Sequence, residues 1–282
     1  MKIDINGQQS RTLVLISGIA SLVLTLGIAR FGYTPLLPVM QNQTWLNDLY
    51  GGWLATSNYI GYICGAIVAS LVSDLKTKDL LYRTGLVLAV LTTLATGLTE
   101  DLILWTILRF IAGFSSAAGL LIGSGLLLNW LIRHNQHRVV GIHFSGLGLG
   151  IVLVSVSVWF MNQYLTWDQQ WFMLGFIGLL LLIPAWIWLP RPDTSGMTRT
   201  GQAMNDMPPE KQFMILIFLA YLCAGFGYVV SATFIVDMIE SVEALQGTGE
   251  LAFLVIGIAA TPACIIWDLV ARKTGVITAL LY

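Results

Sequence analysis

Long apolar stretches separated by short polar segments follow one another along most of the chain. A helix needs about 20 mainly apolar residues to cross the hydrocarbon of a bilayer. By that criterion the pattern predicts eight complete membrane spans, at residues 12–39, 49–73, 80–99, 102–132, 139–162, 171–190, 212–238 and 250–270. A ninth apolar stretch begins near Val276 and ends at Tyr282, after a rise of only about 10 Å. We therefore expect an all-α fold, a polytopic bundle of membrane helices.

Arginines and lysines gather in alternate loops, and this alternation predicts the orientation of the spans. Basic residues occupy the segment before the first predicted span and the loops after the second, fourth, sixth and eighth. The intervening loops carry acidic residues and no arginine or lysine. The positive-inside rule then places the N-terminus in the cytoplasm.

The composition agrees with a protein embedded in lipid. Hydrophobic residues make up 56% of the 282 positions and charged residues 10%, against about 25% charged residues in a soluble domain. The formal net charge of −1 gives no reason to expect a nucleic-acid partner. The three cysteines lie inside apolar stretches without a CxxC pair, so neither a disulfide framework nor a metal site is predicted.

A long polar segment divides the chain into two parts. Residues 191–211 carry proline, glycine, serine and threonine, which predicts a flexible cytoplasmic linker. Before it stands a half of six spans, residues 1–190, and after it a second, incomplete part, residues 212–282.

The two parts resemble each other weakly. Sliding the chain on itself by 198 positions places Gly27 on Gly225 without a gap, and Arg30 then falls on Tyr228. Few identities support this register, but it fits two parallel halves of one design. Close helix contacts are predicted at three GxxxG pairs, which are Gly61/Gly65, Gly119/Gly123 and Gly146/Gly150.

Two formal charges lie well inside the predicted spans, Arg30 in the first and Arg109 in the fourth. An arginine at the bilayer centre costs roughly 2.5 kcal/mol or more. The two can share a level in the membrane, where both would face an aqueous cavity and bind an anionic or strongly polar solute. In the alternative, Arg30 extends to the membrane surface and Arg109 bonds backbone carbonyls. The spans contain no internal carboxylate, and Asp237 at the end of the seventh is the nearest.

Other polar residues in the spans allow a functional and a structural interpretation. Tyr33 lies on the face of Arg30, where it either hydrogen-bonds a solute or anchors at the interface. Asn58 either contacts the solute or holds two helices together. His143 in the fifth span either relays protons or packs in the protein interior.

Patterns typical of enzymes are missing from the sequence. The glycines of GLGLG at 146–150 lie within a predicted span and lack the spacing of a dinucleotide fingerprint. The sequence contains no GxSxG nucleophile motif, no HExxH and no cysteine–histidine cluster. We therefore expect neither an enzyme nor a bound cofactor or metal.

Several motifs resemble the major facilitator superfamily (MFS), whose transporters have six spans, a cytoplasmic linker and six more. LRFIAGFSSAAG at 108–119 resembles its Arg-x-x-x-Gly signature, with Arg109 and Gly113 at the matching positions. The signature of the loop after the second span survives in part, with Asp74 at its acidic position and Lys78 at a basic one. The resemblance implies a gating role for these two loop residues.

GIARFGYTPLLP, SNYIGYICGA, IHFSGLGLGI and GYVVSATF are similar to an uncharacterised bacterial branch, the YbfB/YjiJ type. The spacing from Arg30 to Pro38 is also similar to organic-phosphate exchangers of the superfamily, which pair that arginine with a second in the seventh span. Tyr228 stands at that second position here, so a monocarboxylate or a zwitterion fits better than a phosphate dianion. The resemblance implies a monomer in the bacterial inner membrane.

These observations together predict a secondary active transporter of a small polar or anionic solute, working by alternating access and coupled to protons. Arg30 would bind the solute, with Tyr33, Asn58 and Tyr228 nearby and Arg109 setting the cavity potential, while His143 would relay protons. Because the superfamily has twelve spans and this sequence stops within a ninth, we expect the chain as given not to cycle. The alternative is a non-transporting membrane protein, such as an inactive truncated relic.

Overall fold

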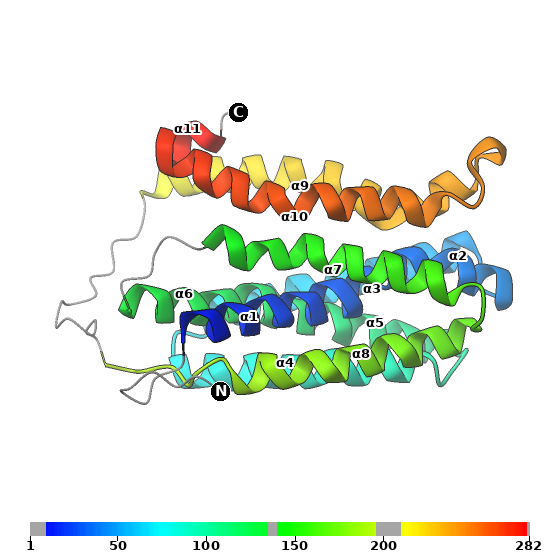
Figure 1. Ribbon diagram of the computed structural model, residues 1–282, viewed down its shortest axis with the longest axis horizontal. Helices are drawn as coiled ribbons and strands as arrows, with labels where there is room; N and C mark the ends of the chain where they lie inside the picture. The colour runs from blue at the N-terminus through cyan, green and yellow to red at the C-terminus, as the bar shows by residue number, and fades with distance from the viewer. Residues whose placement is uncertain (1–9, 135–139, 196–209, 281–282) are drawn as a thin grey trace.

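The computed structural model describes residues 10–134, 140–195 and 210–280, and every regular element in that part of the chain is helical. Most helices run nearly parallel to one long axis (Figure 1). Their bounds are α1 Arg11–Leu22, η1 Val23–Phe31, α2 Tyr33–Gln43, α3 Asp48–Leu71, α4 Leu75–Thr96, α5 Leu102–Ala117, η2 Ala118–Gly123, α6 Ser124–Arg133, α7 Val140–Met161, α8 Trp167–Ile187, α9 Lys211–Glu240, η3 Glu243–Leu245, α10 Gly249–Thr274 and α11 Val276–Leu280.

Seven helical stretches of the described chain are long and apolar enough to cross a membrane, which confirms the all-α membrane fold. They are Arg11–Gln43, Asp48–Leu71, Leu75–Thr96, Leu102–Arg133, Val140–Met161, Trp167–Ile187 and Leu251–Thr274. The seventh predicted span, residues 212–238, corresponds to α9.

Two predicted boundaries are wrong by several residues because capping side chains start helices earlier than hydropathy indicates. The third span was expected at residue 80, but Asp74 accepts a hydrogen bond from the Thr77 N–H and α4 begins at Leu75. The sixth was expected at residue 171, but a capping box formed by Thr166 and Gln169 starts α8 at Trp167. Polar caps satisfy the first N–H groups of a helix at the membrane surface.

Two spans contain π-helical turns that hydropathy does not reveal. In the first span η1 joins α1 to α2, and in the fourth η2 joins α5 to α6. The two segments lie against each other, because a Cβ on Gly119 of η2 would stand 2.0 Å from Oγ1 of Thr25 in η1. The Ser116 hydroxyl, two residues before η2, donates to the Thr25 carbonyl at 2.8 Å. Wide helical turns of this kind are frequent at functional sites.

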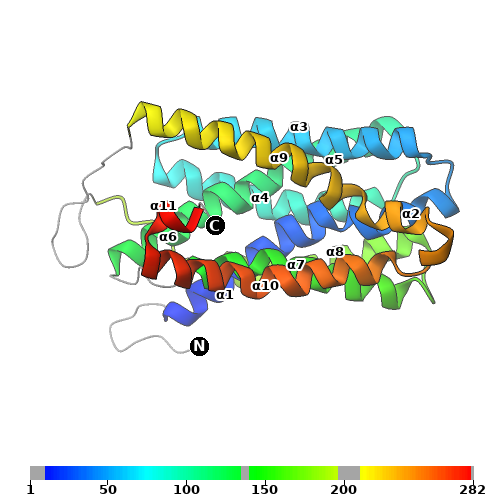
Figure 2. The ribbon, with the colours of Figure 1, turned by 90° about the horizontal axis from the view of Figure 1, so that it is seen from above.

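Glycines allow the closest helix contacts, as the GxxxG pairs predicted. The Cα atoms of Gly27 and Gly150 face each other where η1 crosses α7, each position lacking room for a Cβ. A Cβ on Gly61 of α3 would stand 2.0 Å from the Phe110 carbonyl oxygen on α5. On α10, Gly257 approaches the backbone of α7 in the same way. Helices α9 and α10 thus form a layer that packs mainly through α7 and α2 (Figures 1 and 2).

The bundle has two chemically different ends. We call one the acidic end, where α2 leads to α3, α4 to α5, α7 to α8 and α9 to α10; it carries Asp48, Glu100, Asp101, Asp168 and Glu243. We call the other the basic end, where α3 leads to α4 and α10 to α11; it carries Lys76, Lys78, Arg133, Arg191 and Arg272. The described chain begins and ends at the basic end, at the left of Figure 1.

Candidate functional site

Arg30 points from η1 into the bundle, toward α3. Its guanidinium carbon lies 4.8 Å from the ring centre of Tyr59 and 4.5 Å from that of Tyr62, a cation–π arrangement with both rings. The Nε atom is buried and has no hydrogen-bond partner among the described residues. The side chain therefore keeps an unused N–H donor inside the protein.

Arg109 approaches the same turn of the first span from α5. Its side chain is 4% exposed, and its terminal nitrogens donate to the carbonyls of Ala29 at 3.1 Å and Arg30 at 3.4 Å. The Tyr33 ring centre lies 4.4 Å from the guanidinium carbon. The Nε atom of Arg109 also lacks a partner in the described chain. Arg109 thus bonds backbone carbonyls, as the structural alternative expected. These bonds hold its guanidinium at the same level of the bundle as Arg30.

The polar groups of Tyr33 and Asn58 are engaged with the protein itself. The Tyr33 hydroxyl donates to the Gly51 carbonyl at 2.9 Å, and the Asn58 amide donates to the Arg109 carbonyl at 2.9 Å. Both side chains are nearly inaccessible to solvent, at 1% and 2%. The Asn58 contact fits the alternative in which this residue holds two helices together, and the Tyr33 hydroxyl joins α2 to α3. A hydrogen bond from either side chain to a solute stays a prediction.

Backbone carbonyl groups near Arg30 can accept hydrogen bonds from side chains. Pro35 has no N–H, so it cannot donate to the preceding turn, which contains Arg30 and Phe31. The same turn lies where π spacing gives way to α spacing, between η1 and α2. Arg109 supplies side-chain donors to carbonyls at this point. The charge of Arg109 thus stabilises the turn that carries the other arginine.

A small cavity joins these groups, and we call it the arginine cavity. Its volume is about 10 Å³, which is space for roughly one water molecule. Across it, the hydroxyls of Tyr59 on α3 and Thr233 on α9 are 2.6 Å apart and share a hydrogen bond. None of the described lining residues is acidic; they are Arg30, Phe31, Tyr33, Thr34, Ala55, Asn58, Tyr59, Arg109 and Thr233.

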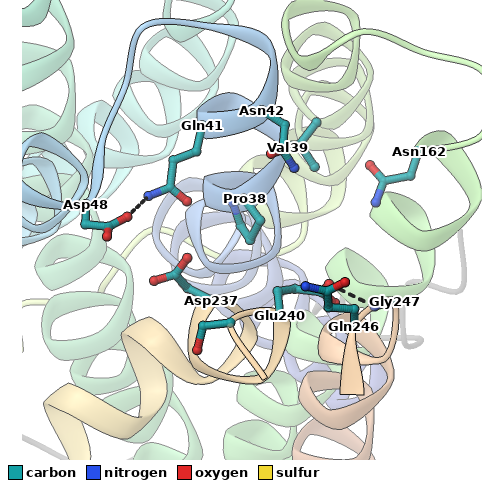
Figure 3. Close-up of a pocket in the computed structure, with 11 residues that line it drawn as sticks. Pro38, Val39, Gln41, Asn42, Asp48, Asn162, Asp237, Glu240, Gln246 and Gly247 are labelled. Carbon is teal, nitrogen blue, oxygen red and sulfur yellow. Dashed lines mark hydrogen bonds between the residues drawn. The ribbon is translucent and has the colours of Figure 1, made fainter. Parts of the chain in front are cut away.

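A larger cavity of about 650 Å³ opens at the acidic end, and we call it the acidic cavity (Figure 3). Asp48, Asp237 and Glu240 are its carboxylates. Asp48 accepts from the Gln41 amide at 2.8 Å, and Glu240 accepts from two backbone N–H groups of the α9–α10 connection. The half-buried carboxylate of Asp237 makes no hydrogen bond or ion pair with a described residue.

His143 lies away from both cavities, buried between α7, α1 and α6. Its Nε2 is 2.8 Å from the Ser124 hydroxyl. Its Nδ1 has no partner in the described chain and faces Gly18, where a Cβ would stand 2.5 Å away. The histidine therefore holds a polar contact on one side and an apolar wall on the other.

The two loop residues of the predicted gate have different surroundings. Asp74 is exposed, and hydrogen bonds from the Thr77 hydroxyl and N–H, at 2.7 and 2.8 Å, lower the pKa of its carboxyl group. Lys78 lines a cavity of about 420 Å³ at the basic end, with Ser70 and Asn129. The side chain of Tyr228 lies outside the described residues.

Two groups of functional or structural residues were missed in the sequence. Tyr59 and Tyr62 stand three positions apart on α3, a spacing that places both rings on one helix face and could have been recognised. Asp79 and Arg83 form a buried ion pair with N–O distance 3.0 Å, four positions apart on α4. The predicted third span began at residue 80, so Asp79 fell outside it and its pairing with Arg83 was not recognised.

Comparisons with known proteins point to one superfamily. The model of a family described as "Uncharacterised MFS-type transporter YbfB" matches residues 22–282. An "Uncharacterized transporter mfc1" of Schizosaccharomyces pombe is 29% identical over 130 residues, which cover 45% of this chain and 26% of that protein. An "Uncharacterized MFS-type transporter YceJ" of Bacillus subtilis is 26% identical over 164 residues, covering 58% and 42%. The chain thus spans less than half the length of either relative in these matches.

Proposed function

Because the chain belongs to the family described as uncharacterised MFS-type transporter YbfB, we propose that it is a secondary active transporter. It moves a small polar or anionic solute across the membrane by alternating access, with the binding site between the two parts of the chain. The relatives are called transporters without a named solute, so the solute must be inferred from the site.

The observation that supports an anionic group on the solute is the pair of unused Nε donors of Arg30 and Arg109. Both guanidiniums adjoin a cavity with no acidic lining residue in the described chain. A buried cation without a carboxylate is costly, and a negatively charged ligand offsets that cost by accepting the N–H groups. In the proposal Arg30 binds the anionic group and Arg109 maintains the positive potential.

The neighbouring residues have supporting roles in this proposal. Tyr33 and Asn58 hold Arg109 and the wall of the cavity, since their donors are already bonded. Tyr228 contributes a polar contact from α9. Asp74 and Lys78 act in the opening and closing of the basic end, and His143 is the residue we assign to proton coupling. The basic end faces the cytoplasm of a bacterial cell, and the transporter works as a monomer.

Solute-dependent thermal stabilisation of the purified chain in detergent tests the proposal. A panel of small carboxylates, amines and neutral sugars is screened, and we expect stabilisation by carboxylates that is lost in Arg30→Ala. Lys76→Ala removes a cation at the basic end, outside the arginine cavity, and should keep the response. Stabilisation by carboxylates that persists in Arg30→Ala, or none across the panel, contradicts the proposed site.

A further inference from the structure

We propose that the solute is a zwitterion whose carboxylate and ammonium groups are separated by several carbon–carbon bonds. Its carboxylate would bind in the arginine cavity and its ammonium group at Asp237 in the acidic cavity. This inference rests on the proposed function and specifies the solute class of the same site.

The two cavities lie one above the other along the contact between α2 and α9. Thr34 lines the arginine cavity and Pro38, four positions later on α2, lines the acidic cavity. On α9, Thr233 and Asp237 line the same two cavities at the same spacing. Residues four apart lie on one face of a helix. Both walls of this contact therefore lead from one cavity to the other.

The charges change sign over this single turn. Arg30 and Arg109 line one cavity, and each keeps a buried Nε without a partner; Asp237 lines the other with a carboxylate that is unpaired among the residues described. Figure 3 shows the Asp237 carboxylate beside Pro38, on the side of Asp48. Thr233 and Asp237 stand one helical turn apart on α9, so the unpaired acid lies about one turn from the cavity that the two arginines line.

A zwitterion matches this arrangement better than a simple carboxylate or a dicarboxylate. An ammonium group would give Asp237 the partner that it lacks, whereas a second carboxylate would meet Asp48, Asp237 and Glu240. A carboxylate alone would leave the acidic cavity without a partner. The sign pattern therefore favours opposite charges at the two ends of one solute.

The spacing predicts the length of the solute. Four residues of helix rise about 6 Å, and carbon–carbon bonds are about 1.5 Å long. About three to five methylene groups between the charges therefore span the distance. In an α-amino acid the two charged groups share one carbon, which is too short. The arginine cavity has space for about one water molecule. Entry of the carboxylate therefore also requires the Tyr59 and Thr233 hydroxyls to move apart.

Equilibrium binding to the purified full chain in nanodiscs tests this inference, with 5-aminopentanoate, pentanoate, pentylamine and glycine as probes. We expect 5-aminopentanoate to bind about tenfold more tightly than pentanoate, the equivalent of roughly 1.4 kcal/mol. In Asp237→Asn this preference disappears while pentanoate affinity stays unchanged, which also shows that the variant is folded. In Arg30→Gln both carboxylates lose affinity.

Glu100→Gln is the matched control, since it removes a negative charge at the acidic end outside both cavities. It should keep the preference, and Asp237→Glu should keep most of it. Equal affinities for pentanoate and 5-aminopentanoate in the unaltered chain overturn the zwitterion and leave the anion site standing. Binding of neither compound, with no carboxylate bound in a wider panel, overturns the proposed function as well.

Discussion

Arg83 near the basic end and Arg109 in the middle of the bundle are equally buried, each 4% exposed, but their surroundings differ. Arg83 pairs with Asp79 at 3.0 Å and donates to the Leu189 carbonyl at 3.0 Å. Asp79 also pairs with Arg191. In this cluster every charge that is removed from water faces an opposite charge of the protein.

Arg109 has only carbonyl oxygens and an aromatic ring for partners in the described chain, and a second arginine stands beside it. Carbonyl dipoles stabilise a guanidinium without neutralising its charge. Charge removed from water without compensation must be offset elsewhere in the molecule. The difference separates an arginine that joins helices near the basic end from an arginine pair whose charge, in the proposed function, is compensated by a bound anion.

The largest effect on stability is expected at the basic end. Asp79→Ala should lower the free energy of unfolding by about 3–5 kcal/mol, because it leaves Arg83 buried without its carboxylate. Chemical unfolding in detergent, followed by tryptophan fluorescence, measures the change. Arg191→Ala, which removes the exposed second partner of Asp79 and keeps the buried Asp79–Arg83 pair, is the control and should change little. Equal effects of the two substitutions would show that the buried pair is not what stabilises this cluster.

Packing near Arg109 can be disturbed without changing any charge. A Cβ on Gly113 would stand 1.9 Å from the Asn58 carbonyl oxygen, so Gly113→Ala must displace α3 from α5. We expect a loss of about 1–3 kcal/mol in unfolding free energy and weaker carboxylate binding, because Asn58 bonds the Arg109 backbone.

Gly125→Ala is the control for this packing effect, since nothing lies within 4 Å of its Cβ position. Gly125→Ala should leave binding unchanged and stabilise α6 by up to about 1 kcal/mol. If a well-folded Gly113→Ala variant bound carboxylates as the unaltered chain does, the close packing of α3 on α5 would not be what positions Arg109.

Removal of Arg30 should change carboxylate affinity and leave stability nearly unchanged, whereas removal of Asp79 should change stability. In Arg30→Leu the unfolding free energy should stay within about 1 kcal/mol of the unaltered value, since an uncompensated cation is replaced by an apolar group. Carboxylate affinity should fall by at least about tenfold, as expected for loss of a hydrogen bond to a charged group. If Arg30→Leu lost as much stability as Asp79→Ala, the main role of Arg30 would be to stabilise the fold.

The smallest effect concerns the exposed cap of α4. Hydrogen bonds from Thr77 lower the pKa of the Asp74 carboxyl group in the folded state. The ionised cap therefore stabilises the fold at neutral pH, and this contribution is lost as pH falls from about 4 through the lowered pKa. The unfolding midpoint of Asp74→Asn should lie slightly below the original at neutral pH and converge with it in acid. A constant difference would contradict a role for the charge.

Hydropathy predicted the spans well because backbone N–H and C=O groups in lipid must bond each other, and a helix satisfies them all within one segment. The level shared by Arg30 and Arg109 followed from counting residues along two helices. The start of α4 did not follow, since Asp79 and Arg83 appear polar in sequence while neutralising each other in the fold. The hydrogen-bond partners of Tyr33 and Asn58 could not be predicted from the sequence either, because they depend on how α3, α5 and the first span pack together.

The π-helical winding of η1 means that the direction of Arg30 depends on how the helix is wound as well as on residue count. A π turn holds about one residue more than an α turn, because its hydrogen bonds span five residues and not four. If these turns rewound to α spacing without a change in length, each residue would rotate the chain further, by about 100°, and the guanidinium would turn away from Tyr59 and Tyr62. A one-residue deletion between Val23 and Ala29 offsets that rotation, so an alignment with a one-residue gap here would equate side chains that point to the same side of the helix.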